Sequence, residues 1–135
     1  MNKDCIFCKI ANGEISSKTI YEDESFRVIL DLSPATKGHA LILPKSHADN
    51  LYELPVEVAA KVLPVAQQVA TKIKEKLSCD GLNLVQNNGE TAGQTVMHFH
   101  LHLIPRYTDD GQQINWVPGQ PTQDELETVA KQITE

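Results

Sequence analysis

Three histidines at alternate positions constrain the fold of this chain more than any other feature. Residues 97–106 read MHFHLHLIPR, so His98, His100 and His102 alternate with apolar residues. Successive side chains of a β-strand point to opposite faces of the sheet. The run therefore predicts a strand with an apolar face turned to the core and a row of imidazoles on the other face. Because imidazole binds metals and transfers protons near neutral pH, this row indicates a metal site or a group-transfer site.

Other hydrophobic patterns predict four more strands and one long helix. Short apolar runs between turn residues predict strands at residues 20–22, 26–30, 39–43 and 82–87. Apolar residues recur every three or four positions from about Val56 to Leu77, which is typical of an amphipathic helix. Pro64 should bend this helix or break it early, and Asp80-Gly81 should end it.

Short helices are expected near both ends of the chain. One should run from Cys5 to Ala11, and a capping box at residues 122–125 predicts another that continues to about Ile133. A chain of 135 residues can bury one hydrophobic core, and its pattern shows neither a repeat nor an internal linker. We therefore predict a single α+β domain over residues 1–135, with a mostly antiparallel five-stranded sheet, one long helix and short terminal helices.

The charge and hydropathy of the chain exclude several classes of partner. With 12 Lys and Arg against 18 Asp and Glu, the net charge is −6. Binding to nucleic acid normally depends on neutralising phosphates with basic side chains, so we expect no nucleic-acid partner. The sequence has no apolar tract of membrane-spanning length, and its first residues lack the apolar stretch of a secretory signal. We therefore expect no membrane partner and a cytoplasmic location.

Three cysteines do not suggest a disulfide framework. Cys79 stands alone and is interpreted as a small apolar residue. Cys5 and Cys8 have the C-x-x-C spacing, which occurs in metal-binding pairs and in redox dithiols. Two unligated thiols are the third interpretation of this pair.

The histidine run resembles the signature of the histidine triad (HIT) superfamily of nucleotide hydrolases and transferases. That signature is His-φ-His-φ-His-φ-φ, with φ apolar, and residues 98–104 match every position. The resemblance extends in order over nearly the whole chain. The other matching segments are residues 31–34, residues 38–47, Asn87, residues 93–95 and residues 116–119, the last of which resembles the C-terminal loop of the histidine-triad nucleotide-binding (Hint) branch.

The resemblance implies roles for the matching residues. His100 would be the nucleophile that attacks the α-phosphorus, and His102 and His39 would line the phosphate and help to move protons. Gln94 and Thr95 would contact a phosphate oxygen, water or the leaving group. The residues expected to bind the nucleotide are Asp31 at the ribose, Ile6, Phe7, Ile10 and Leu32 at the base, together with Asn87, Gln94, Thr95, His100 and His102.

Each of these roles has a structural alternative. Gln94, Thr95 and Asn87 could simply satisfy backbone groups in a loop. Asp31 could cap the turn that begins beside Ser33-Pro34. The apolar residues expected at the base could be packed in the core. The triad itself could be a half-buried strand that happens to carry histidine.

The same resemblance implies a structural zinc site. Many bacterial HIT proteins, and the galactose-phosphate uridylyltransferase branch, hold zinc with two N-terminal cysteines and two histidines. The corresponding residues of this chain are Cys5, Cys8, His47 and His98. Four protein ligands would close the coordination sphere, as in structural sites. The rival interpretation is a catalytic zinc held by the histidine run itself.

The function implied is hydrolysis of nucleoside 5'-phosphoramidates or acyl-adenylates of the AMP type, through a covalent nucleotidyl-histidine. We expect a purine nucleotide as substrate and a homodimer in which the loop near Trp116 reaches the neighbouring active site. One alternative is a dinucleoside polyphosphate hydrolase, as in the fragile-histidine-triad branch. The other is a nucleotide-binding or scaffold protein with incidental catalysis. A uridylyltransferase is disfavoured, because that branch replaces the third histidine.

Overall fold

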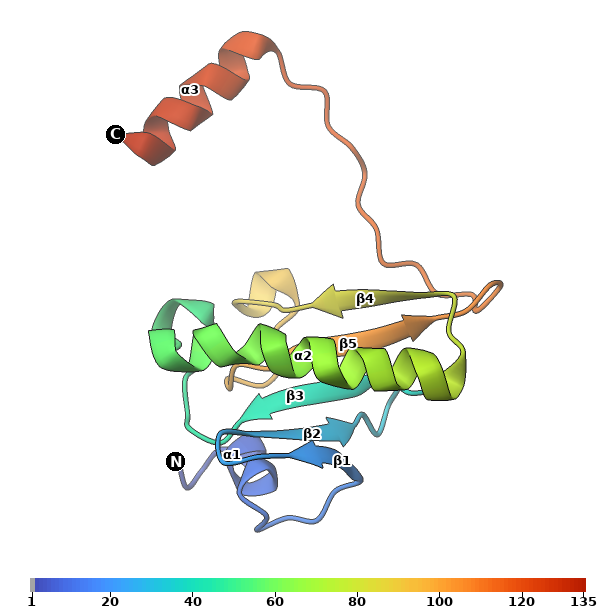
Figure 1. Cartoon of the computed structure of the whole chain (residues 1–135). Coiled ribbons are helices and arrows are strands. Elements are labelled where there is room, and N and C mark those ends of the chain that lie inside the picture. The colour runs from blue at the N-terminus through green and yellow to red at the C-terminus, as the bar shows by residue number, and fades with distance from the viewer. Residues whose placement is uncertain (1) are drawn as a thin grey trace.

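The computed structural model describes residues 2–135 and shows one five-stranded antiparallel sheet with helices on both faces (Figure 1). The strand order is β1-β2-β3-β5-β4. The strands are β1 (Thr19–Glu22), β2 (Phe26–Leu30), β3 (Ala40–Pro44), β4 (Gly81–Val85) and β5 (Leu101–Arg106). The α-helices are α1 (Ile6–Ala11), α2 (Val56–Leu77) and α3 (Gln123–Thr134), with 3₁₀ turns at Leu51–Glu53 and Glu90–Ala92. The predicted α+β class and its five-stranded antiparallel sheet are confirmed.

The strand order brings distant parts of the chain together at the centre of the sheet. β3 pairs with β2 on one side and with β5 on the other, so that Leu41 lies opposite His102. β4 pairs with the other edge of β5, with Val85 opposite His102. His102 therefore sits on an inner strand, where both neighbours fix its backbone.

The main core lies between the sheet and α2, which covers one face (Figure 1). The stripe predicted from the helical period is buried, and it includes Val62, Val65, Val69 and Ile73. The residues that meet it are Phe26, Val28, Ala40, Ile42, Leu101 and Leu103 of the sheet and Phe99, which precedes β5. Full burial of side chains of this size contributes about 1.5–3 kcal/mol each, so this interface is the main source of stability.

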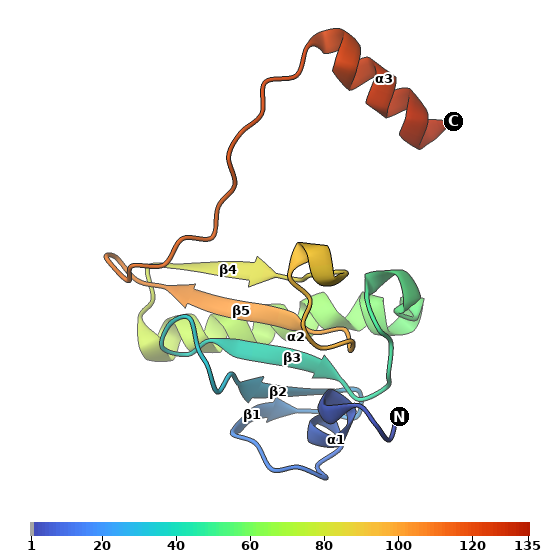
Figure 2. The ribbon, with the colours of Figure 1, turned by 180° about the vertical axis from the view of Figure 1, so that it is seen from behind.

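Helix α1 packs on the opposite face of the sheet, as seen from behind in Figure 2. There Phe7 and Ile10 contact a smaller buried cluster that contains Ile29, Leu41 and Leu43. This second face also carries the imidazoles, so α1 and the histidines share one side of the sheet.

The strand predicted through the histidine run is shorter than expected. β5 begins at Leu101, and His98 and His100 lie before it. The chain bends there because the N–H of Phe99 donates to the carbonyl of Ala48 (2.7 Å) and that of His98 to the carbonyl of Val96 (2.8 Å), outside the sheet ladder. The predicted alternation of faces survives the bend, since Phe99 and Leu101 are still buried beneath α2.

Helix α2 has the predicted bounds, and Pro64 does not break it. The helix ends at Ser78, which adopts a left-handed conformation (φ 55°), before the predicted stop at Asp80-Gly81. Pro64 is on the exposed side of the helix. Of the expected bend or early break, the break was wrong, because the helix loses only one hydrogen bond at Pro64 while the buried stripe holds both halves on the sheet.

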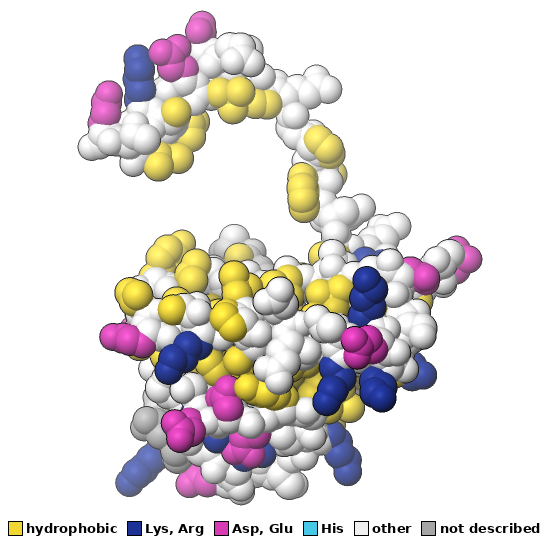
Figure 3. All heavy atoms as spheres, in the orientation of Figure 1, with side chains coloured by type: hydrophobic (Ala, Val, Ile, Leu, Met, Phe, Trp, Pro, Cys, Tyr) yellow, Lys and Arg dark blue, Asp and Glu magenta, His cyan; other side chains and the backbone are white. Residues whose placement is uncertain are grey.

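Residues 111–135 form an exposed C-terminal arm that leads away from the sheet to α3 (Figures 1 and 2). The predicted capping box is present, with Thr122 and Glu125 bonded reciprocally. Trp116 and Val117 are 84% and 93% exposed, and α3 exposes Leu126, Val129 and Ile133. Figure 3 shows hydrophobic side chains on the side of α3 that faces the body of the molecule, and others over α2. Across the described residues, no helix combines the length and apolarity that crossing a membrane would require.

Candidate functional site

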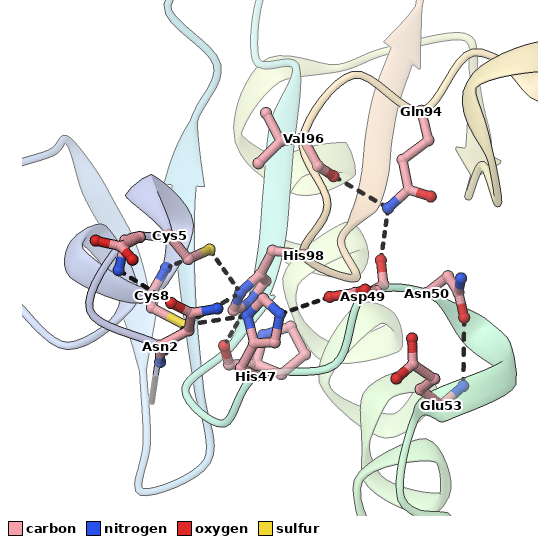
Figure 4. A network of polar contacts seen from close by, with 12 residues as sticks. Asn2, Cys5, Cys8, His47, Asp49, Asn50, Glu53, Gln94, Val96 and His98 are labelled. Carbon is pink, nitrogen blue, oxygen red and sulfur yellow. Dashed lines mark hydrogen bonds and ion pairs between the residues drawn. The ribbon is translucent and has the colours of Figure 1, made fainter.

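Two cysteines and two histidines converge beside α1 (Figure 4). The Sγ atom of Cys8 lies 3.4 Å from Nδ1 of His47 and 3.5 Å from Nδ1 of His98. The Sγ atom of Cys5 lies 3.4 Å from the same nitrogen of His98. The residues that the resemblance implied as zinc ligands are therefore brought together from three separate parts of the chain.

The spacing of these donors suits a tetrahedral zinc ion. Zn–S bonds of about 2.3 Å and Zn–N bonds of about 2.0–2.1 Å require S···N edges of roughly 3.6 Å in a tetrahedron. The S···N distances of 3.4–3.5 Å come close to that value. Two sulfurs and two imidazole nitrogens are also the donor types that zinc prefers, so the residues fit this ion.

Both histidines of this cluster are held by their second nitrogen. Nε2 of His98 donates to the carbonyl of Pro44 at 2.9 Å, and Nε2 of His47 donates to Oδ1 of Asp49 at 2.7 Å. These bonds place the ring proton on Nε2 and leave the Nδ1 lone pair for a metal. Sequence analysis did not identify Asp49, although a carboxylate two residues after a ligand histidine is a usable signal.

Burial shifts the pKa of two members of this cluster, His98 and Cys8. Cys8 and His98 are fully buried. Burial lowers the pKa of His98 to about 4, so this imidazole is neutral at pH 7, as a metal ligand must be. Burial also raises the pKa of the Cys8 thiol, and a bound cation would offset that cost by stabilising the thiolate.

The middle histidine of the run is turned to a different partner. His100 donates through Nδ1 to the carbonyl of His98 at 2.7 Å, which leaves the Nε2 lone pair free for another bond. Phe7 from α1 meets the ring of His100 edge-on, with centroids 5.0 Å apart. Burial lowers the pKa of His100, so the ring is neutral near pH 7. A neutral, oriented imidazole with a free nitrogen is suited to act as a nucleophile.

A second imidazole pair lies beside His100. The ring centroids of His100 and His102 are 5.0 Å apart. Nδ1 of His102 lies 3.0 Å from Nε2 of His39, which is 3.6 Å from Oδ2 of Asp31. Burial lowers the pKa of His39 and brings that of His102 to about 4, so both are neutral near pH 7. The structure thus assembles His39, His100 and His102, with Asp31 at the edge, as the resemblance implied.

The side chain of Gln94 is hydrogen-bonded to backbone groups in and around the loop that precedes the histidines. It is 1% exposed, its Nε2 donates to the carbonyls of Asp49 (2.6 Å) and Val96 (3.0 Å), and its Oε1 accepts from Gly89 (2.8 Å). These bonds agree with the structural alternative, in which Gln94 satisfies backbone groups. Thr95 is exposed beside this loop and Asn87 is half-buried. Contact of these three side chains with a substrate stays a prediction.

The residues expected around the nucleotide differ in exposure. Phe7 and Ile10 are half-buried and pack on the sheet, whereas Ile6 and Leu32 are 51% and 93% exposed. Asp31 caps the turn, since its Oδ1 accepts from the N–H of Ser33 at 2.8 Å, while its Oδ2 is the atom nearest to His39. The structural and nucleotide-binding interpretations of Asp31 therefore involve different oxygens of one carboxylate.

Comparison with known proteins identifies the family to which this chain is similar. The HIT domain model matches residues 12–109. Adenosine 5'-monophosphoramidase HNT1 of Saccharomyces cerevisiae is 39% identical over 131 residues, which are 96% of this chain and 80% of that protein. A crystal structure from Streptococcus mutans UA159 has a TM-score of 0.94 and 42% identity, over 98% of this chain and 85% of that chain.

A Zn-bound histidine triad family protein from Mycobacterium smegmatis is also similar, with a TM-score of 0.77 and 37% identity over 96% of this chain and 95% of that chain. Cys5 and Cys8 precede the region that the family model matches, so that match bears on the histidines and not on the cysteines. The matched region holds the complete histidine run, His39 and the five strands that position them. This chain therefore belongs to the HIT domain family.

Proposed function

We propose that this protein is a Hint-like hydrolase that cleaves nucleoside 5'-phosphoramidates or acyl-adenylates of the AMP type. The observation that carries the proposal is the state of His100. Its Nδ1–H donates to the carbonyl of His98, so its Nε2 lone pair is free to act as a nucleophile. The cluster of candidate metal ligands contains His98 but not His100. The similarity to a protein named adenosine 5'-monophosphoramidase supports an amine as leaving group.

The reaction would proceed in two displacements. Nε2 of His100 bonds to the α-phosphorus while the bond from phosphorus to the amine breaks. The amine leaves with a proton that His102 would donate, and His102 would regain a proton from the attacking water in the second step. The carbonyl of His98 stabilises the positive charge on the ring through the Nδ1–H. Water then attacks phosphorus, the bond to Nε2 breaks, and the nucleoside monophosphate is released with His100 restored.

The neighbouring residues would serve this reaction in distinct ways. His102 and His39 would line the phosphate and move protons, since their rings form a bonded pair beside His100. Asp31 would accept from the ribose hydroxyls. Phe7 and Ile10, with the exposed Ile6 and Leu32, would contact a purine base. Asn87, Gln94 and Thr95 would face the phosphate and the leaving group, which for Gln94 requires one of its loop bonds to open.

Zinc would be bound by Cys5, Cys8, His47 and His98 as a structural ion. Through its four ligands it would cross-link three segments: the N-terminal end of α1, the end of β3 and the start of the histidine run. This role leaves the chemistry to His100. It is supported by the closed donor set, because all four tetrahedral positions would be filled by protein.

A homodimer would cover the apolar surface that one chain leaves exposed. Leu63, Pro64 and Leu84 form an apolar patch on α2 and the edge strand β4. The exposed arm carries Trp116 and the apolar side of α3. The arm could pack on a second copy, with Trp116 reaching that copy's active site. An interface at this patch would also account for the exposed Pro64.

A substrate panel tests the proposal. The zinc-loaded protein is given an adenosine 5'-phosphoramidate, an acyl-adenylate and a dinucleoside polyphosphate, and products are quantified. We expect the first two to be hydrolysed with the highest kcat/KM, and mass spectrometry of quenched reactions to find a nucleotidyl group on His100. His100→Ala should lower turnover at least about 10³-fold.

Three results would contradict the proposal. Equal turnover by His100→Ala and by the natural protein would remove the covalent mechanism. Tight nucleotide binding without hydrolysis of any of the three substrates would favour a binding or scaffold protein, and preference for the dinucleotide would favour a polyphosphate hydrolase.

A further inference from the structure

The segment of residues 107–112, called the arm base below, follows β5 and includes the first two residues of the C-terminal arm. It is bonded to the loop of residues 33–38 that precedes His39. The hydroxyl of Tyr107 donates to the carbonyl of Lys37 at 2.7 Å, and Nε2 of Gln112 donates to the carbonyl of Ala35 at 2.9 Å. Just before the arm base, the carbonyl of Pro105 accepts from the hydroxyl of Thr36. The loop is therefore held at three successive residues by a part of the chain about 70 residues away in sequence.

Gln112 is itself fixed in place. Its carbonyl accepts from Arg106 (2.6 Å), and its N–H donates to Oδ1 of Asp110 (2.9 Å). Arg106 and Asp110 are joined by two parallel bonds of 2.8 and 2.9 Å. A bidentate pair of this kind has a defined geometry. The side chain of Gln112 thus reaches Ala35 from a backbone that is already immobilised.

Ala35, whose carbonyl accepts from Gln112, is bonded to His39 through its own N–H, which belongs to the preceding peptide group. The N–H of Ala35 lies 2.9 Å from Nδ1 of His39. A backbone N–H can only donate, so Nδ1 must accept, and the ring proton of neutral His39 lies on Nε2. That Nε2–H then donates to Nδ1 of His102 at 3.0 Å, which places the ring proton of His102 on its own Nε2.

The reverse arrangement is blocked at Ala35. If His102 carried its proton on Nδ1, then His39 would have to accept at Nε2 and carry its proton on Nδ1. Two N–H groups would then face each other at 2.9 Å, between Ala35 and His39. The position of one backbone N–H therefore selects the tautomers of two imidazoles.

We propose that Gln112 and Tyr107 are positioning residues: by holding the carbonyls of Ala35 and Lys37 they keep the N–H of Ala35 against His39, and this N–H fixes the proton positions of His39 and His102. The consequence for catalysis rests on the hydrolase function proposed above: His102 would offer an Nε2–H to the phosphate or the leaving group. The proton positions themselves do not depend on that function. The arm is thus connected to the imidazoles of its own chain through Gln112.

Nitrogen NMR of the zinc-loaded, full-length protein tests the proposal directly. With ¹⁵N-labelled histidine, long-range ¹H–¹⁵N spectra distinguish the Nδ1–H from the Nε2–H tautomer of each neutral ring. We expect His39 and His102 both as Nε2–H at pH 8. A spectrum with His102 predominantly as Nδ1–H would overturn the assignment.

Variants of the arm base test the positioning role. Tyr107→Phe and Gln112→Ala, singly and combined, should populate the Nδ1–H form of His102 and lower kcat roughly fivefold with KM almost unchanged. Gln113→Ala alters the next, exposed residue of the arm. Tyr21→Phe removes a comparable hydroxyl bond, to Asp23 on the far side of the sheet. Both controls should keep the tautomers and the turnover of the natural protein.

The outcomes separate the two proposals. Unchanged tautomers in the folded double variant would overturn the role of Gln112 and Tyr107, and if the double variant does not fold, the single variants decide. The predicted tautomers together with no hydrolysis of any substrate would contradict the proposed function and leave the assignment of proton positions intact.

Discussion

The sulfur of Cys8 lies 3.5 Å from Nδ1 of His98, although 90 residues separate them in the chain. Only the pairing of β3 with β5, together with the packing of α1 on the sheet, brings these two atoms together. The contact joins the proposed zinc site to the residue whose carbonyl orients His100. Loss of zinc should therefore weaken the fold first and the chemistry only as a consequence.

Cys5→Ser and Cys8→Ser should each abolish stoichiometric zinc binding. Each variant removes a thiolate from the four-ligand set, and we expect an accompanying loss of several kcal/mol of unfolding free energy. Metal analysis of the purified proteins and thermal melts are the measurements, with Cys79→Ala as the control that keeps the set intact. If chelation stopped turnover at once and reversibly in a still-folded protein, the zinc would be catalytic.

Asp49→Ala should lower zinc affinity about 10–100-fold, because His47 would lose the carboxylate that orients it. Asp49→Asn keeps an oxygen acceptor for His47, so its zinc affinity should fall less than that of Asp49→Ala. Competition with a chromogenic chelator measures both, and Glu90→Ala on the nearby exposed turn serves as control. Equal affinity in Asp49→Ala and the natural protein would show that the bond between Asp49 and His47 does not contribute.

Stability should fall as the pH is lowered from about 7 toward 4, in part through His102. Burial places its pKa at about 4 in the folded state, against about 6.5 in the unfolded chain. Over that interval the unfolded state binds more protons, so the free energy of unfolding decreases with decreasing pH. This single residue should contribute on the order of 1–3 kcal/mol. The unfolding free energies of the natural protein and His102→Gln, measured by urea titration, should differ at pH 7 and converge near pH 4. A constant difference between pH 7 and pH 4 would contradict the lowered pKa of His102.

Gly38→Ala should destabilise the fold by about 2–4 kcal/mol. An added Cβ would lie 2.5 Å from Cδ1 of Leu77 and 3.3 Å from Cγ of Pro105, on a backbone with φ of +90°. Gly89 has the same φ but open space around it, so Gly89→Ala isolates the cost of conformation at about 1–2 kcal/mol. Chemical denaturation measures the free energy of unfolding of both variants. Equal decreases would show that Leu77 and Pro105 move aside for the added Cβ without an energetic cost.

The exposed apolar surface should make the protein dimeric in solution. Leu63→Glu introduces a charge into the apolar patch on α2 and should shift the mass measured by sedimentation equilibrium from dimer to monomer. Removal of residues 113–135 should weaken association in the same assay. Lys61→Glu changes an exposed residue nearby and is the control. A monomeric natural protein at micromolar concentration would refute the homodimer.

Local patterns in the sequence were sufficient for most of the elements. The period of three to four residues predicted α2 with its exact bounds, and the capping box predicted the start of α3. Both signals depend on residues a few positions apart, which an isolated stretch of chain already contains. The burial of every second residue at Phe99, Leu101 and Leu103 was predictable in the same way, because alternate side chains of a strand point to the same face.

Tertiary structure decided how the residues of the histidine run are divided between two tasks. On an ideal strand the three imidazoles would be equivalent, but the bend before β5 turns His98 to the cysteines, His100 to a carbonyl and His102 to His39. Asp49, the amide of Gln94 and the N–H of Ala35 likewise acquire partners only once the loops are packed. Periodicity determines which face of an element is apolar, because that depends on local geometry. The bond that each polar atom makes depends on sheet order and on contacts between distant residues, and no local pattern contains that information.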